Sequence, residues 1–263
     1  MFDERPISDD GELAAVRDEH VPSAFVFDVG GDFETLPPSI AENLLAVVDG
    51  IDPLSYDESW LPDDAPETLR RIAGGEFTIG APGDGGVAWT RQTTPPAVFV
   101  KPRLEGSPEG FVDFLIAEAF VEIGLGAPEH FLGFFGDRYR SLAAAVPLSP
   151  ADTYQLAAAL FTAYVGRSTR AVFDGWGGEH PELHAEWIDA GERLEPRLGE
   201  LSRDVALGRT GFADAAELAC SAVKHCVELP TPFDALDSAA YEQYGPDFAV
   251  RWAEKTFEAL DGE

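Results

Sequence analysis

The longest stretch with few polar positions runs from residue 108 to residue 123, in the sequence PEGFVDFLIAEAFVEI. At about 100° per residue, an α-helix over this stretch would be apolar on two sides. One side would carry Val112, Ile116, Ala119, Phe120 and Ile123. Phe114 and Val121 would point nearly the opposite way. Because a helix that is apolar on two sides must be covered on two sides, we expect the rest of the chain to fold around it.

Two carboxylates, Glu118 and Glu122, lie one turn apart on a third side of this helix, beside Phe111 and Leu115. A carboxylate that is buried next to apolar side chains needs a hydrogen-bond or charge partner. We therefore expect these two residues to pair with a cation from elsewhere in the chain. The candidates are Lys101, Arg103, Arg138 and Arg140.

The residues before 107 alternate between helical and strand patterns. A strand is predicted at 24–29 and a helix at 37–48. Three further strand signals, at 76–79, 87–92 and 97–101, are separated by turn-forming residues, which predicts a small antiparallel β-meander.

The length of the last turn sets the register of that meander. With three loop residues in the turn, Trp89 would face Lys101 and Arg91 would face Phe99 across the strands. One sheet face would then carry Phe77, Ile79, Val87, Trp89 and Phe99. We expect this face to lie on the central helix.

After Ser107 the hydrophobic spacing is helical throughout. Further helices are predicted at 128–135, 138–146, 149–173, 181–194, 196–207, 212–228, 238–244 and 246–260. The fold class predicted is therefore α+β, predominantly helical, with the small antiparallel β-meander packed on a helical bundle. We expect residues 1–263 to form a single globular unit, and the one plausible subdivision separates a mixed half, 1–106, from an all-helical half, 107–263.

The charge balance is extreme, with 48 acidic against 18 basic residues and a formal net charge of −30. Such self-repulsion is largely screened near 1 M salt, where the Debye length is about 3 Å, so the chain is predicted to be salt-adapted. A disordered acidic chain is disfavoured by 45% hydrophobic content and 18 phenylalanines. Nucleic acid is an unfavourable partner, because its binding requires a basic surface.

The expected compartment is the cytoplasm. The amino terminus, MFDERPISDD, has no apolar segment of the secretory kind, and no run approaches the roughly 18 apolar residues of a membrane span. Cys220 and Cys226 fall about 120° apart on one predicted helix, which is unsuitable for a disulfide. We expect both to be small buried hydrophobic residues in a reducing environment.

The acidic composition resembles that of haloarchaeal cytoplasmic proteins. The stretches Trp60-LPDDAPETL, Gly85-GVAWTRQT and Val98-FVKPRLEGSPE resemble those of an uncharacterised haloarchaeal family. The resemblance covers most of the chain and implies a compartment. It brings no activity and no catalytic motif with it.

Positive charge is concentrated in two segments, 87–104 and 138–173, each with a net charge of +3. Either these segments are buried and their cations neutralise buried carboxylates, or the cations line a pocket for an anionic ligand. The candidate ligand-binding residues are Arg91, Lys101, Arg103, Arg138 and Arg140.

His180 and His184 have the four-residue spacing that can chelate a metal within one helix, with Glu186 or Asp189 as a possible third ligand. However, Pro181 suits the first helical position, which places His180 before the helix. We therefore expect His180 and His184 to lie in solvent at the start of this helix and to bind no metal.

The interpretation we favour is a non-catalytic, soluble protein that binds an anionic small molecule or a protein partner. The alternative is a hydrolase or metal-dependent enzyme that uses His180 and His184. No cofactor, oligomeric state or ligand identity follows from the sequence.

Overall fold

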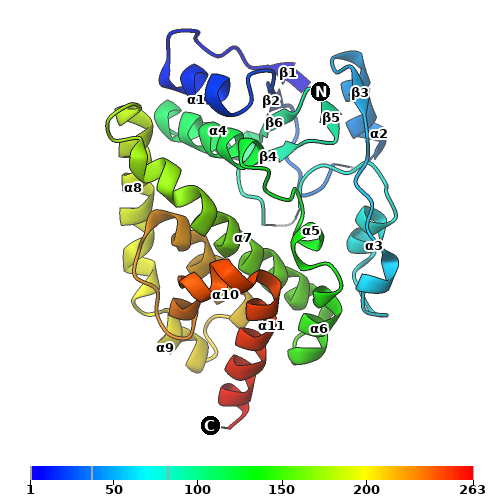
Figure 1. Ribbon diagram of the computed structural model, residues 1–263, viewed down its shortest axis with the longest axis vertical. Helices are drawn as coiled ribbons and strands as arrows, with labels where there is room; N and C mark the ends of the chain where they lie inside the picture. The colour runs from blue at the N-terminus through cyan, green and yellow to red at the C-terminus, as the bar shows by residue number, and fades with distance from the viewer. Residues whose placement is uncertain (1, 37, 82, 263) are drawn as a thin grey trace. The chain divides into compact units, whose positions relative to one another are not determined.

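The computed structural model describes residues 2–36, 38–81 and 83–262. The chain divides into two compact units, each assembled from separate stretches of sequence (Figure 1). The first unit comprises residues up to 55, 75–129 and 172–187, and the second comprises 56–74, 130–171 and the residues from 188 on.

The first unit contains a small mixed sheet and the helices that cover it. Its elements are β1 (Phe2–Glu4), α1 (Glu12–His20), β2 (Phe25–Val29), α2 (Pro38–Ala41), η1 (Glu42–Ala46), β3 (Gly50–Ile51), β4 (Val87–Thr90), β5 (Thr93–Thr94), β6 (Ala97–Val100), η3 (Pro102–Leu104) and α4 (Glu109–Gly124). The prediction of an α+β, predominantly helical chain is confirmed. The central helix α4 belongs with the sheet in this unit, so the two units do not divide at residue 106.

The main sheet has the strand order β1-β2-β6-β4. Strands β2 and β6 are parallel, with Phe25 opposite Ala97, whereas β1 and β4 are antiparallel to their neighbours. The predicted antiparallel pairing of 87–92 with 97–101 is confirmed, whereas the prediction of a three-stranded antiparallel meander is wrong. Residues 76–79 contribute only an isolated bridge, between Leu36 and Ile79, and the apolar strand β2 takes the position beside β6.

The register between β4 and β6 also differs from the prediction, since Trp89 lies opposite Val98 and Ala88 opposite Phe99. The connection between the two strands occupies residues 91–96 instead of three loop residues. The partner of Trp89 is therefore three positions earlier in β6 than predicted. Because side chains alternate between the two faces of a strand, a shift by an odd number of residues changes which side chains share a face. The expected common face is divided as a result. Trp89 packs in the cluster that contains α4, together with Val26, Val98 and Val100. Phe99 packs on the other side with Phe27, Ala88, Phe77 and Ile79.

Helix α4 is buried on two sides, as its sequence predicts. Its buried residues are Val112, Phe114, Ile116, Ala117, Glu118, Ala119, Phe120, Val121 and Ile123. The ring of Phe114 meets that of Phe173 edge to face at a centroid distance of 6.0 Å. The indole Nε1 of Trp89 donates to Glu122 Oε2 at 2.6 Å, which anchors the sheet to the helix.

The second unit is helical. Its elements are η2 (Glu58–Trp60), α3 (Glu67–Ala73), α5 (Phe131–Phe135), α6 (Arg138–Ala145), α9 (Leu201–Ala206), α10 (Phe212–Ala222), η4 (Val223–His225), η5 (Phe233–Leu236) and α11 (Ala239–Asp261). Helices α7 (Pro150–Gly175) and α8 (Pro181–Leu198) contribute residues to both units. Within the described residues, no helix combines the length and the apolar character needed to cross a bilayer.

Local signals predicted most of these helices but missed some of their ends. Gly245, with φ of 47° and ψ of −121°, separates two helical segments of α11, in agreement with the separate helices predicted there. A left-handed backbone at this point favours glycine. By contrast, α8 continues through Pro196, where a break was predicted.

The two cysteines lie in different environments. Cys220 is buried on α10, as expected, and burial raises the pKa of its thiol. Cys226 is exposed, because α10 ends at Ala222 and a short 3-10 turn follows. The expectation that both are buried is therefore wrong for Cys226.

Candidate functional site

The parallel pairing of β2 and β6 determines where the candidate site lies. The carboxyl ends of adjacent parallel strands meet at one edge of a sheet, which is the usual ligand position in open α/β sheets. Here the residues after β2 include Asp32, Phe33 and Glu34, and those after β6 include Lys101 and Arg103. Residues 83–86, which precede the antiparallel strand β4, reach the same edge, where the amide of Lys101 donates to the carbonyl of Gly86 at 2.8 Å. We call Asp32, Phe33, Glu34, Asp84, Lys101 and Arg103 the Lys101 edge.

Arg103 joins the two strand ends. Its Nε donates to the two carboxylate oxygens of Asp32 at 2.9 and 3.1 Å, and its Nη2 donates to Glu34 Oε1 at 2.7 Å. The hydrogen bond from Arg103 lowers the pKa of Asp32. The guanidinium is therefore engaged within the chain, and its role at this edge is to hold the loop after β2.

Lys101 has a different environment from the arginines. The residue is only 1% exposed, and its Nζ atom has no hydrogen-bond partner within residues 2–36, 38–81 and 83–262. The ammonium lies 4.7 Å from the centroid of the Phe33 ring, a distance typical of a cation–π contact. Burial lowers the pKa of Lys101, and the negative charge of Asp84 opposes that shift. The predicted pairing of Lys101 with Glu118 is wrong, since the amine lies at the strand end among other carboxylates.

Asp84 faces back into its own loop. Although the residue as a whole is exposed, its Oδ2 accepts a hydrogen bond from the amide of Ala81 at 2.5 Å. Lost hydration raises the pKa of Asp84 to about 6, while Lys101 acts in the opposite direction. This carboxyl group can therefore exchange a proton near neutral pH.

Gly80 allows the loop to approach the end of β2. Its φ is +80°, and a Cβ atom there would lie 2.8 Å from the carbonyl oxygen of Glu34 and 3.0 Å from the Phe33 ring. Any larger residue would push the loop away from Phe33. The backbone at Gly80 thus keeps Phe33 and Asp84 close to Lys101.

Arg91, another member of the predicted ligand-binding set, lies in the same unit and is engaged elsewhere. Its Nη2 donates to the carbonyl of Ala127 at 2.5 Å, and its guanidinium lies 5.7 Å from the centroid of the Trp89 ring. These contacts hold the segment after α4 against β4.

Arg138 and Arg140 belong to the second unit and also have acceptors within the chain. The Nε of Arg138 donates to Asp247 Oδ1 at 2.6 Å. Arg140 donates to the carbonyl oxygens of Ser59 and Leu61, the first at 3.1 Å. The five predicted residues are therefore divided between the units, and the expected partnership of the arginines with Glu118 and Glu122 is replaced by these bonds.

A half-buried carboxylate that the sequence interpretation missed, Glu129, organises the turn after β4. It accepts hydrogen bonds from Thr90 Oγ1 at 2.7 Å, from the Arg91 amide at 2.8 Å and from Gln92 Nε2 at 2.6 Å. Burial raises the pKa of Glu129 to about 7, although the three hydrogen bonds act in the opposite direction. Three donors from residues 90–92 share this one carboxyl group, so we interpret it as a structural network.

Replacing Glu129 with alanine should lower the free energy of unfolding by about 2 kcal/mol, because three donors lose their acceptor. The raised pKa predicts how this loss varies with pH. The protonated carboxyl is favoured in the folded state, so its contribution is largest below the unfolded pKa of about 4.5 and declines as pH rises through about 7. Urea titrations in KCl at pH 5 and pH 8 should therefore show the larger deficit at pH 5. Glu105→Ala, at an exposed position, is the control, and an equal deficit in both variants would contradict the prediction.

The two histidines singled out in the sequence do not form a solvated pair. His180 precedes α8, as predicted, but it is only 8% exposed and its ring lies 6.1 Å from that of Trp176. The expected solvated helix start is therefore wrong for His180. His184 is half-buried beside Trp187 at a centroid distance of 5.5 Å. Nowhere in the described part of the chain do three or more His, Cys, Asp or Glu residues converge in a way that could hold a metal.

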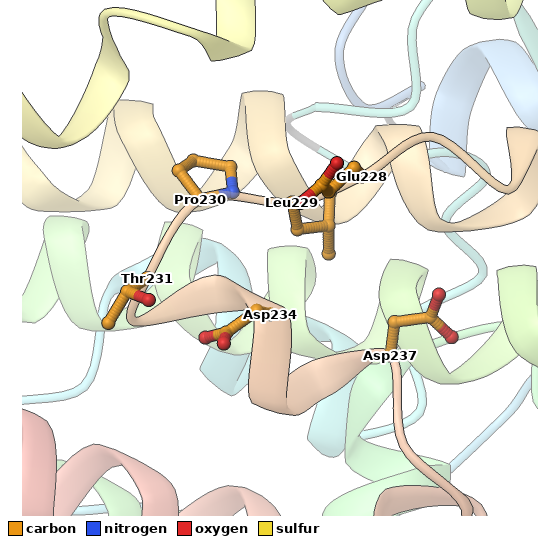
Figure 2. A pocket seen from close by; sticks show the side chains of 6 residues that line it. All are labelled: Glu228, Leu229, Pro230, Thr231, Asp234 and Asp237. Carbon is orange, nitrogen blue, oxygen red and sulfur yellow. The ribbon is translucent and has the colours of Figure 1, made fainter.

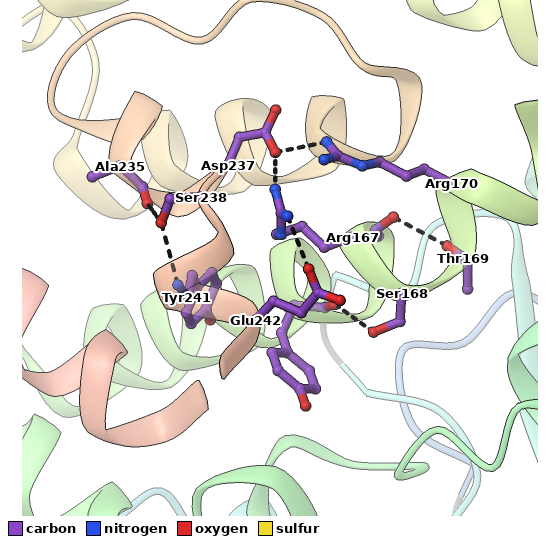
Figure 3. Close-up of polar contacts among 11 residues, drawn as sticks. Arg167, Ser168, Thr169, Arg170, Ala235, Asp237, Ser238, Tyr241 and Glu242 are labelled. Atoms are coloured by element: carbon purple, nitrogen blue, oxygen red, sulfur yellow. Dashed lines mark hydrogen bonds and ion pairs between the residues drawn. The ribbon is translucent and has the colours of Figure 1, made fainter. Parts of the chain in front are cut away.

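The second unit has a hollow of about 460 Å³ beside the loop that leads into η5. Its lining residues, shown in Figure 2, are Glu228, Leu229, Pro230, Thr231, Asp234 and Asp237. Asp237 also accepts from Arg167 and, at 2.6 Å, from Arg170 (Figure 3). Three carboxylates line this hollow, which makes it unfavourable for an anionic ligand.

A family model described as "Family of unknown function (DUF7089)" matches residues 1–260. The match spans both units. Comparison with the curated proteins and with the solved structures found no match.

Proposed function

The chain belongs to the DUF7089 family, and we propose that it binds an anionic small molecule at the Lys101 edge. One observation carries this proposal: the ammonium of Lys101 is buried and has no hydrogen-bond partner in the described part of the chain. A buried charge without a partner is unfavourable, and an anionic or carbonyl oxygen would supply the missing acceptor. We further propose a salt-adapted cytoplasmic protein of the haloarchaeal type, which the net charge of −30 supports.

The charges at the Lys101 edge disfavour a ligand that carries several negative charges. Lys101 and Arg103 contribute two positive charges, and Asp32, Glu34 and Asp84 contribute three negative charges when ionised, so the sum is −1. A polyanion such as a triphosphate would meet strong repulsion in this setting. A monoanion with one oxygen directed at Lys101 is better suited.

The burial of Lys101 favours a small molecule over a protein partner. A protein partner needs exposed residues to contact, whereas Lys101 is only 1% exposed. No arrangement around His180 and His184 within the described residues supports the alternative of a metal-dependent hydrolase.

Native mass spectrometry in molar ammonium acetate tests the proposal. Protein purified from cell extract should retain a small molecule, and Lys101→Met should abolish the retained mass. Lys255→Met removes an exposed lysine and should leave the retained mass unchanged. A mass that persists in Lys101→Met, or no retained mass in the unmodified protein, would rule the proposal out.

A further inference from the structure

We propose that Lys101 binds its ligand covalently, as a Schiff base with the carbonyl carbon of a small oxo acid. This inference rests on the proposed function and adds a chemical class of ligand to it. The amine of Lys101 lies at the carboxyl end of the parallel strand β6 and is enclosed. It has neither a hydrogen bond nor an ion pair within the described residues.

The environment of Lys101 suits a nucleophilic amine. Only the neutral amine has the lone pair that attacks a carbonyl, and burial lowers the pKa of Lys101 toward that form. Since no acceptor or donor in the described residues engages Nζ, the lone pair is not committed to another contact. The Phe33 ring closes one side at 4.7 Å and limits hydration of the amine.

Asp84 provides the acid that imine formation requires. The neutral amine nitrogen adds to the carbonyl carbon, one of its protons passes to the carbonyl oxygen, and a neutral carbinolamine results. The hydroxyl group then leaves as water with a proton from Asp84, whose pKa of about 6 keeps part of it protonated near neutral pH. The nitrogen keeps its remaining proton, so the product is a protonated imine beside an Asp84 carboxylate. One protonated imine and one water are formed from one amine, one carbonyl and the proton of Asp84, with no oxidant or reductant.

Charge explains why an oxo acid suits the site better than a simple aldehyde. A protonated imine carries one positive charge, and the carboxylate of the oxo acid carries one negative charge, so the adduct brings no new net charge into the enclosed site. Arg103 is unable to serve as the counter-ion, because Asp32 and Glu34 already occupy its guanidinium. The ligand therefore supplies its own counter-charge.

Reductive trapping tests this inference, because the chain has only three lysines, Lys101, Lys224 and Lys255. The protein would be incubated with pyruvate and cyanoborohydride in 2 M KCl, and the modified lysine identified by peptide mass mapping. We expect Lys101 to be modified faster than the exposed Lys255 at pH 7, because a lowered pKa leaves more of the Lys101 amine in the neutral form. The rate at Lys101 should also level off at a lower pH than the rate at Lys255.

Two variants separate chemistry from folding. Lys101→Arg keeps a cation but is unable to form an imine, so it should fold with an unchanged circular dichroism spectrum and give no adduct at position 101. Asp84→Asn should slow trapping at Lys101 by about 100-fold or more, as expected for loss of a general acid. Modification of Lys255 without Lys101, or equal rates at both, would overturn the inference. If Lys101 still retains an anion in native mass spectra while no adduct forms, the covalent step fails and the proposed binding function stands.

Discussion

Replacing Arg167 with methionine should lower the free energy of unfolding by about 3 kcal/mol, because it removes one member of a largely buried ion-pair group. The Arg167 side chain is only 8% exposed, and it donates to Asp237 and, at 3.0 Å, to Glu242 (Figure 3). Arg170 also donates to Asp237, so that carboxylate keeps one partner in the variant. Glu242 is more exposed and becomes hydrated, which places the loss at the lower end of the range for buried pairs.

Urea unfolding in high KCl measures this loss. Arg193→Met is a matched control in the same unit, since Arg193 pairs with Asp189 on the exposed surface of α8 and should change stability by less than about 0.5 kcal/mol. The double variant Arg167→Met with Asp237→Asn should lose less than the sum of the single variants, since the two side chains interact directly. Equal losses of unfolding free energy in Arg167→Met and Arg193→Met would show that burial does not strengthen the ion pairs of Arg167.

Raising KCl from about 10 mM to about 1 M should raise the midpoint of thermal unfolding more than any single substitution changes it. The Debye length falls from about 30 Å to about 3 Å over this range, and most repulsion among the 48 acidic residues is screened. A gain of roughly 5 kcal/mol would correspond to a rise of roughly 10–20 °C for a chain of this size. Circular dichroism at a fixed wavelength follows the transition.

Sucrose at equal osmolality is the control for this experiment. It stabilises folded proteins by exclusion from their surface but screens no charge, so its effect should be much smaller than that of KCl. A midpoint that is no higher in molar KCl than in 10 mM KCl would show that the negative charge is not a salt adaptation.

The helices could be predicted because their signals are local. The apolar run that forms α4 predicts burial on two sides, and both sides are buried. Gly245 and Pro246 predict the break within α11. The end of α10 was harder to predict, because apolar spacing continues past Ala222 and tertiary packing decides where the helix stops.

The local pairing of β4 with β6 could be predicted, but the rest of the sheet could not, because it joins distant segments. Strand β2 at 25–29 pairs with β6 at 97–100. The hydrophobic pattern predicts that each segment is a strand, but it does not indicate that these two strands are neighbours. The register between β4 and β6 depends on the long connection at 91–96. An error of three residues there was enough to exchange the two faces of the sheet.

The candidate site was predictable only in part. The scarcity of positive charge drew attention to Lys101, and the structure places it at the candidate site. The arginines have the same sequence signal, yet their partners are mostly carbonyls and carboxylates that the fold alone brings near them, such as Ala127 for Arg91. Asp84 had no distinguishing signal, since its position follows from the close approach of Gly80 to Phe33 and Glu34.

The discontinuous make-up of the two units determines when each can fold during synthesis. The hydrophobic core around α4 includes Phe173, Trp176, Leu183 and Trp187, which leave the ribosome long after the sheet residues. Until then the apolar surface of α4 lacks part of its cover. The first unit therefore matures late, through contacts of high sequence separation, and such topologies fold slowly. The incomplete chain must therefore stay in solution while the last segment of the first unit is still being made.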